Sequence, residues 1–265
     1  MVDLRKADCL ELLKSLQDNS VDLVVTDPPF GVNFQSHRRK EKYEHIQNDD
    51  NLEFLPELMA ELNRVLKPDT HIYMFCAFKT IDVFKQEFEK YFELKNIIIW
   101  NKGNFGTGNY YRFKYEMVLF GQKGNKPMKN HSFADVLDCN GTGNEFHPTQ
   151  KPVDLLKIFI QNSSDENGVV LDTFMGSGST GVACKQLNRN FIGFEIDDEY
   201  FRIAQERIEK GIATKSTEKC SKYFTFIHIK YALNRLRIAC IALFWVRLIF
   251  LSTEPEITLF WGIFL

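Results

Sequence analysis

Short apolar runs alternate with amphipathic segments along the first 210 residues, and this alternation limits the possible folds more than any other feature. The runs have the nearly continuous apolar character of parallel strands that are covered on both faces. The predicted strands are Val21–Thr26, His71–Phe75, Leu94–Trp100, Tyr115–Phe120, Val169–Asp172 and Phe191–Ile196. The predicted helices are Cys9–Gln17, Phe54–Leu66, Thr80–Tyr91, Pro152–Gln161, Ser179–Leu187 and Asp198–Glu209. The pattern predicts an α/β fold with a mostly parallel sheet and helices on both faces.

The composition is that of an ordinary soluble domain, but the charge is unevenly distributed. The 265 residues are 44% hydrophobic and 26% charged, with a net charge of −2. The segment Lys95–Asn130 carries seven basic residues and one acidic residue, Glu116, so its net charge is +6. A chain polarised in this way can offer one basic face to a polyanion.

The six cysteines lie at least twenty positions apart and form no CxxC pair, so we expect no metal site. The amino terminus, MVDLRKADCLELL, carries acidic residues early and lacks the apolar core of a signal peptide. Reduced thiols and a cytoplasmic location are therefore expected.

A glycine-rich turn in VVLDTFMGSGSTGVACKQLNRNFIGFEID suggests a cofactor site. Gly176, Gly178 and Gly181 match G-x-G-x-x-G between a predicted strand and a predicted helix. Such glycines let a ligand approach the backbone closely, and Glu195, at the end of the next strand, can accept hydrogen bonds from a ribose. The pattern alone fits either NAD or S-adenosylmethionine.

A second possible site follows the strand Val21–Thr26, at the stretch DPPF. In open α/β sheets ligands bind at the carboxyl ends of strands, where Asp27 and Asp172 would meet if their strands are neighbours. The Asp27 carboxylate and the carbonyls of Pro28 and Pro29 are acceptors that can hold an –NH2 group, and Phe30 offers a face on which a base can stack. Holding both hydrogens of an unreactive exocyclic amine would free its lone pair for methyl transfer.

Four blocks of the chain together resemble the amino-group DNA methyltransferases. They are TDPPF at Thr26–Phe30, HPTQKP at His147–Pro152, LDTFMGSGSTG at Leu171–Gly181 and GFEID at Gly193–Asp197. The catalytic block precedes the cofactor block, which is the order of the family's beta class, and the resemblance covers roughly residues 1–210. It implies a Rossmann-like methyltransferase fold and S-adenosylmethionine as cofactor. The cofactor-binding residues that it implies are Asp8, Lys151, Asp172, Phe174, Gly176, Ser177, Gly178, Thr180 and Glu195.

Two positions depart from the family pattern, and one bears on the target base. Phe30 stands where tyrosine is more usual, and Thr173 where proline is common. Family members with aspartate first in the catalytic block mostly methylate adenine N6, whereas serine there usually accompanies cytosine N4. Asp27 therefore favours adenine, with cytosine N4 as the alternative.

Three polar residues admit a second interpretation. Asp8 could lie near the cofactor's adenine or simply cap a helix. His147 could act as a base, although it more simply shapes the loop before the helix at Pro152. Lys151 could reach a carboxylate or phosphate, or remain a solvated charge.

The DNA substrate must be flipped at the target base, because the amine is out of reach inside a duplex. Residues 100–146 are the expected target-recognition segment, in which WNKGNFGTGNYY could wedge into DNA or flank the flipped base. The expected phosphate contacts are Arg38, Arg39, Lys40, Lys102, Arg112 and Lys123.

The tail, residues 213–265, is separate from the predicted methyltransferase domain at 1–212. Its uncharged runs, Ile238–Val246 and Ile257–Leu265, have nine residues each. A bilayer-spanning helix needs about 20, so we do not expect a membrane anchor.

The sequence thus predicts a site-specific N6-adenine methyltransferase that acts on double-stranded DNA by direct displacement, as a monomer or homodimer. The resemblance leaves open a cognate restriction endonuclease as partner. The alternatives from other classes are an NAD-dependent oxidoreductase, which leaves DPPF and HPTQKP unexplained, and a DNA-binding protein without catalysis.

Overall fold

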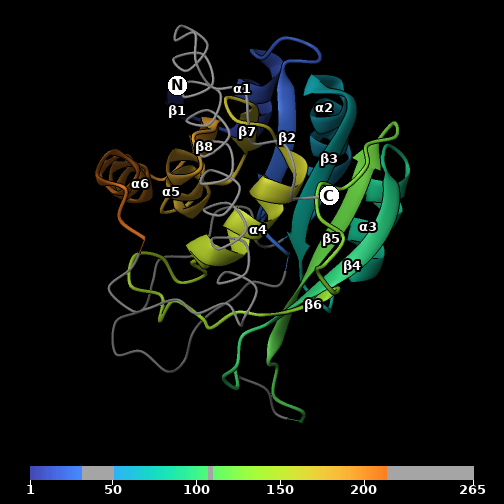
Figure 1. Ribbon diagram of the computed structural model, residues 1–265, viewed down its shortest axis with the longest axis vertical. Helices are drawn as coiled ribbons and strands as arrows, with labels where there is room; N and C mark the ends of the chain where they lie inside the picture. The colour runs from blue at the N-terminus through green and yellow to red at the C-terminus, as the bar shows by residue number, and fades with distance from the viewer. Residues whose placement is uncertain (32–50, 107–109, 214–265) are drawn as a thin grey trace, which may run out of the picture. The chain divides into compact units, whose positions relative to one another are not determined.

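The computed structural model describes residues 1–31, 51–106 and 110–213 (Figure 1). The described helices and strands all belong to one compact unit within Met1–Cys220. Its strands are β1 Val2–Lys6, β2 Val21–Thr26, β3 Leu66–Cys76, β4 Glu93–Asn101, β5 Tyr115–Lys123, β6 Val136–Asp138, β7 Val169–Asp172 and β8 Asn190–Glu195. Its helices are α1 Cys9–Lys14, α2 Leu55–Val65, α3 Ile81–Glu89, α4 Val153–Ser163, α5 Ser179–Gln186 and α6 Asp198–Lys210.

The described strands form one sheet in the order β1-β8-β7-β2-β3-β5-β4-β6. Strand β5 runs antiparallel to both neighbours, and the other paired strands are parallel. Helices α1, α2 and α3 cover one face, and α4, α5 and α6 cover the other (Figure 1). This arrangement confirms the predicted Rossmann-like fold with a mostly parallel, doubly covered sheet.

Apolar side chains fill both interfaces between helices and sheet. On the face of α1–α3, the core includes Leu13, Leu58 and Phe88. On the other face, the ring of Tyr73 stacks on Phe159 with centroids 4.4 Å apart. Burial on both faces explains why the strands lack the alternating pattern of a half-exposed sheet.

Several predicted bounds differ from the structure, notably at β3, β6 and α4. Strand β3 begins at Leu66 rather than His71, because the register against β2 shifts after Leu66 and the segment around Pro68 is accommodated as an irregularity. Strand β6 lies within the expected target-recognition segment, where no strand was predicted, and its three residues pair with β4. Helix α4 begins one residue late, because Pro152 is its N-cap.

The described helices are each too short or too polar to cross a bilayer. The predictions for the tail fall on residues 214–265, outside the described part of the chain.

Candidate active site at the carboxyl edge of the sheet

A cavity of about 950 Å³ opens at the carboxyl ends of the parallel strands. Strands β2 and β7 are hydrogen-bonded neighbours, as the sequence interpretation required, and the hydroxyls of Thr26 and Thr173 meet just beyond them at 2.8 Å. Asp27 and Asp172 therefore line one cavity, together with Phe30 and Glu195. The two sequence blocks that suggested chemistry form a single site.

The two carboxylate oxygens of Asp27 differ in their hydrogen bonding. Its Oδ2 accepts a hydrogen bond from the ammonium of Lys151, whereas Oδ1 is buried without a hydrogen-bond partner among the described residues. Burial raises the pKa of Asp27 to about 6, Lys151 opposes this rise, and the negative charge of Glu116 adds to it. A buried acceptor without a partner is costly unless a ligand satisfies it.

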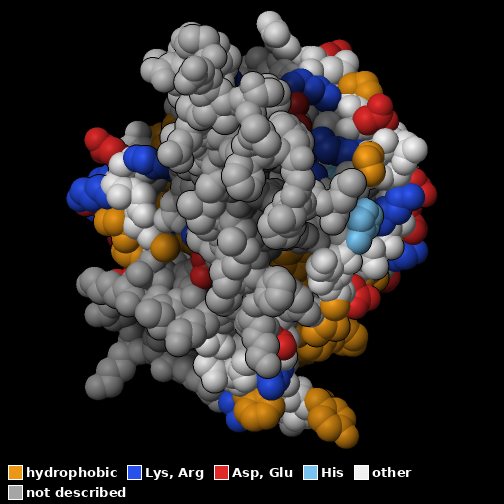
Figure 2. Space-filling view, in the orientation of Figure 1, with side chains coloured by type: hydrophobic (Ala, Val, Ile, Leu, Met, Phe, Trp, Pro, Cys, Tyr) orange, Lys and Arg blue, Asp and Glu red, His pale blue; other side chains and the backbone are white. Residues whose placement is uncertain are grey.

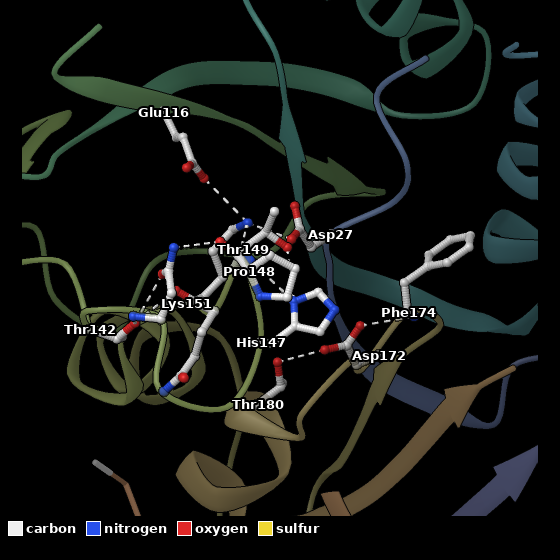
Figure 3. A network of polar contacts seen from close by, with 12 residues as sticks. Asp27, Glu116, Thr142, His147, Pro148, Thr149, Lys151, Asp172, Phe174 and Thr180 are labelled. Carbon is white, nitrogen blue, oxygen red and sulfur yellow. Dashed lines mark hydrogen bonds and ion pairs between the residues drawn. The ribbon is translucent and has the colours of Figure 1, made fainter. Parts of the chain in front are cut away.

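Lys151 joins Asp27 to a second carboxylate, that of Glu116 on β5 (Figure 3). The Lys151 Nζ lies 3.3 Å from Glu116 Oε2, and the Lys102 Nζ lies 2.7 Å from Glu116 Oε1. Burial lowers the pKa of Lys151, but the two carboxylates outweigh that effect and leave it raised. The interpretation of Lys151 as a solvated charge was wrong, since its side chain is only 6% exposed.

The DPPF turn is fixed by contacts on both sides. The Phe30 ring meets Phe84 edge-on with centroids 6.4 Å apart, and the Phe30 carbonyl accepts a hydrogen bond of 3.0 Å from the Thr80 hydroxyl. Pro28, Pro29 and Phe30 all line the cavity. The turn therefore presents carbonyls and a ring beside the Asp27 carboxylate.

At the end of the neighbouring strand β7, Asp172 organises the glycine-rich loop (Figure 3). Its oxygens accept hydrogen bonds from the Phe174 N–H at 3.1 Å and the Thr180 hydroxyl at 2.6 Å. Burial nevertheless raises the pKa of Asp172 to about 7, and these hydrogen bonds only partly offset it. The half-buried Phe174 ring packs edge-on against Phe54.

Glu195 at the end of β8 closes the loop from the other side. One oxygen accepts the Gly176 N–H at 2.9 Å, and the other accepts the N–H groups of Ile196 and Asp197, each also at 2.9 Å. The Gly178 N–H is bonded to the Met175 carbonyl at 2.7 Å. A dinucleotide site presents such N–H groups to a pyrophosphate. Here the Gly176 N–H is bonded to the Glu195 carboxylate and the Gly178 N–H to a loop carbonyl, so neither is free for a pyrophosphate, which argues against the NAD alternative.

Two of the predicted cofactor residues also have packing roles. Gly178 has φ +80°, and a Cβ there would lie 3.0 Å from both Ala204 and Ile208 of α6. The Ser177 hydroxyl and carbonyl both accept from the guanidinium of Arg207. These residues hold the loop against α6, so their types are explained without a ligand.

Asp8 and His147 have clear structural roles. Asp8 caps α1, since its Oδ1 accepts from the Leu10 N–H at 2.9 Å, and it also lines the cavity. The His147 Nδ1 accepts from the Thr149 N–H, and its ring packs on Tyr200. Burial, with Lys151 and Arg207 nearby, lowers the pKa of His147 to about 3, so the ring is neutral and shapes the loop.

The residues predicted to contact DNA differ in where they lie relative to the cavity. Arg38, Arg39 and Lys40 lie outside the described residues. Lys102 is held by Glu116, while Arg112 is exposed and donates to the Gly106 carbonyl at 3.0 Å. Lys123 pairs with Thr70 at the amino end of β3, away from the cavity, where its ammonium donates to the carbonyls of Asn63 and Leu66.

Glu116 is the site residue that the sequence interpretation missed. The available signal was its position as the sole acidic residue in the basic segment Lys95–Asn130. No group of metal-ligating side chains occurs within the three described ranges.

Comparison with known proteins identifies the family. A family model described as DNA methylase matches residues 21–206, which is most of the chain. This chain belongs to the N6/N4 DNA methylase family. The methylase is 32% identical to the type II methyltransferase M.HpaI of Haemophilus parainfluenzae over 238 residues, covering 77% of this chain and 73% of the relative.

Solved structures of methyltransferases share the fold. The crystal structure of the M1.HpyAVI–SAM complex is 31% identical, with a TM-score of 0.61, and the match covers 78% of this methylase and all of that chain. The cytosine-N4-specific PvuII DNA methyltransferase matches with a TM-score of 0.62 at 20% identity, covering 79% and 90% of the two chains. The methylase is thus a DNA amino-methyltransferase, and the likeness to the PvuII enzyme shows that the fold alone does not choose the base.

Proposed function

We propose that this methylase transfers a methyl group from S-adenosylmethionine to the N6 amino group of adenine in double-stranded DNA. The observation that carries the proposal is Asp27, whose carboxylate leaves one buried oxygen without a partner beside a shared cavity. An exocyclic amine is the kind of donor that such an oxygen lacks.

The residues of the DPPF turn would hold the flipped base. Asp27 Oδ1 and the Pro28 carbonyl each accept a hydrogen bond from the amine, and Phe30 stacks on the ring. Directing both hydrogens to acceptors leaves the nitrogen lone pair free. A methylated amine would lose one proton, and Asp27, as the acceptor beside the nitrogen, would be placed to take it.

S-adenosylmethionine, when bound, supplies the methyl group on a positively charged sulfur. Glu195 and the Phe174–Gly178 loop would hold the cofactor, with Asp172 supporting that loop from below. The fit rests on the site's own chemistry: the carboxylates of Asp27, Asp172 and Glu195 line the cavity, and the paired N–H groups of Gly176 and Gly178 suit a ligand with a ribose but no pyrophosphate.

The choice of adenine rests on the first residue of the catalytic block. Aspartate at this position favours adenine N6, whereas family members that act on cytosine N4 usually carry serine. Cytosine N4 is the second candidate, since the PvuII enzyme shares the fold.

The turn between β4 and β5 is the surface that we propose for DNA. Exposed aromatic side chains gather there beside basic ones (Figure 2). They include Phe105, Tyr110, Tyr111 and Phe113, and the guanidinium of Arg112 lies 5.4 Å from the Phe105 ring. Aromatic faces stack on unpaired bases and cations contact phosphates, so the composition suits DNA opened around a flipped base.

The test is transfer of a labelled methyl group to DNA, followed by nucleoside analysis. We expect N6-methyladenine, and recovery of N4-methylcytosine instead would overturn the choice of base. Asp27→Ala should reduce transfer by at least about 10²-fold while cofactor binding is retained. Asp82→Ala, at an exposed position of α3, is the matched control and should transfer normally.

A further inference from the structure

The proposed methyl transfer requires that the Asp27 carboxylate keep one orientation, and this orientation is fixed by other residues. Of its two oxygens, only Oδ2 is anchored, and the anchor is Lys151 from the loop before α4. Rotation of the carboxylate would exchange the bound and unbound oxygens. The position of the Lys151 ammonium therefore decides where the free acceptor points.

Lys151 is in turn held from the side opposite Asp27. Glu116 Oε2 lies 3.3 Å from its Nζ, and the Thr149 carbonyl accepts from the same ammonium at 3.2 Å. Figure 3 shows the ammonium between the two carboxylates. The ammonium donates hydrogen bonds to Asp27 Oδ2 and to the Thr149 carbonyl, and Glu116 Oε2 adds an ion pair that restricts where the ammonium can lie.

Glu116 is fixed independently of the catalytic turn. It lies on β5 in register with Trp100 of β4, and its second oxygen is ion-paired to Lys102 at 2.7 Å. The charges alternate in sign along the chain of contacts from Asp27 to Lys102. Strand β5, which is hydrogen-bonded to a strand on each side, thus supports an acceptor that lies on a turn.

We infer that Glu116 is a positioning residue, which acts through Lys151 to keep one oxygen of Asp27 directed to the substrate amine. The inference rests on the proposed function and adds a residue to it. Because Glu116 contacts Lys151 and not the reacting atoms, it is not itself catalytic.

Other ionisable groups also act on Asp27, and the test must separate them. The groups that face it are Lys151, Glu116, Lys102, Asp172 and Cys76. Glu116 raises the pKa of Asp27 and Lys151 lowers it. Removing the Glu116 charge should therefore lower the pKa of Asp27, and removing the Lys151 charge should raise it. A simple loss of packing would not produce shifts of opposite sign.

The experiment compares Glu116→Gln, Lys151→Met and the wild-type enzyme by single-turnover methyl transfer across pH. Glu116→Gln should reduce the transfer rate about tenfold or more with little change in KM for DNA, because the orientation of the acceptor is lost. In Glu116→Gln the fall of the transfer rate at acidic pH should begin at a lower pH than in the wild-type enzyme. In Lys151→Met it should begin at a higher pH. Glu93→Gln, the same change at an exposed glutamate of β4, should alter neither.

A measurement without turnover separates this inference from the proposed function. The Asp27 carboxyl is followed by ¹³C NMR, with Asp27→Asn to identify its resonance. Opposite displacements of its titration in Glu116→Gln and Lys151→Met support the coupling even if DNA is not the substrate. An unchanged rate and titration in Glu116→Gln, or displacements in the same direction, would overturn the inference. Absence of transfer by the wild-type enzyme would instead overturn the proposed function.

Discussion

Asp172 is buried and Asp27 is largely buried, both carboxyl groups have raised pKa values, and both line one cavity. For an acidic group, a raised pKa means that burial has made the charged form less stable. A cation bound in the cavity would favour the charged form again. The two residues therefore link the binding of a positively charged cofactor to pH.

We predict that affinity for S-adenosylmethionine increases as pH rises from 6 to 8. Below pH 7 a proton must leave Asp172, whose pKa is about 7, before the cation is fully stabilised, so binding is weaker. Calorimetry in buffers of different ionisation enthalpy should detect proton release on binding. The product, S-adenosylhomocysteine, lacks the positive charge on sulfur and should show a smaller pH dependence, and equal dependence for both ligands would contradict the prediction.

The rate of methyl transfer should depend on pH through Asp27. In the proposed mechanism Asp27 must be a carboxylate to accept the amine's hydrogen bond, and its pKa is about 6. Single-turnover rates should thus fall about tenfold per pH unit below that value, because the active fraction falls in proportion. A rate independent of pH between 5 and 8 would show that Asp27 is not titrating in the reacting complex.

At the scale of elements, strand ends were more predictable than irregular segments. Strands β2 and β7 have the predicted bounds because each is a buried apolar run that stops at an acidic or polar residue. Asp27 and Asp172 could be placed in one site because carboxyl ends of parallel strands meet at one edge. Strand β6 was missed since its pairing depends on β4, a partner distant in sequence.

Helices α5 and α6 offer a direct test of packing behind the cofactor loop. A Cβ on Gly181 would lie 2.4 Å from Ile208 Cδ1 and 2.8 Å from the Phe191 ring. Gly181→Ala should therefore destabilise the protein by about 1–3 kcal/mol, measured by denaturant unfolding. At Gly141 a Cβ would meet nothing within 4 Å, so Gly141→Ala is the control, and equal stability of the two variants would contradict this account.

The β4–β5 turn can be tested without disturbing the fold. Tyr110 and Tyr111 are 97% and 98% exposed, so replacing both with serine removes little folded-state packing. We expect DNA affinity to fall about tenfold or more, because stacking contributes roughly 1–3 kcal/mol per base. Cofactor affinity should stay constant. Tyr91→Ser, at an exposed tyrosine that follows α3 and does not line the cavity, is the control, and unchanged DNA binding in the double variant would remove this surface from the proposal.

For the whole molecule, counting charges along the sequence overestimated the positive charge that remains unpaired in the folded protein. The segment Lys95–Asn130 has a net charge of +6, but several of its lysines are compensated within the fold. Lys95 pairs with Glu93, Lys102 with Glu116 and Lys129 with Asp165. Charge counted along a chain does not reveal which partners tertiary folding supplies, and Glu116 was missed for the same reason.

The described unit should function without the tail. The family match ends at residue 206, and Arg207 donates to the Ala213 carbonyl at 2.7 Å. A chain ending at residue 213 keeps that hydrogen bond, and we expect it to fold, bind cofactor and transfer methyl groups at a rate within about twofold of the full chain, since the site lies within it. Loss of cofactor binding on truncation would show that residues 214–265 are part of the functional unit.

The reversed direction of β5 has a consequence for how target preference can change. Because β5 runs back from the edge where β4 ends, the turn joining them emerges beside the cavity, and both of its ends are anchored in the sheet. Insertions into such a turn leave the register of the sheet unaltered. One short connection can therefore be lengthened, shortened or exchanged between relatives while the chemistry stays in place, which makes it a natural point for diversification and for engineering by transplantation.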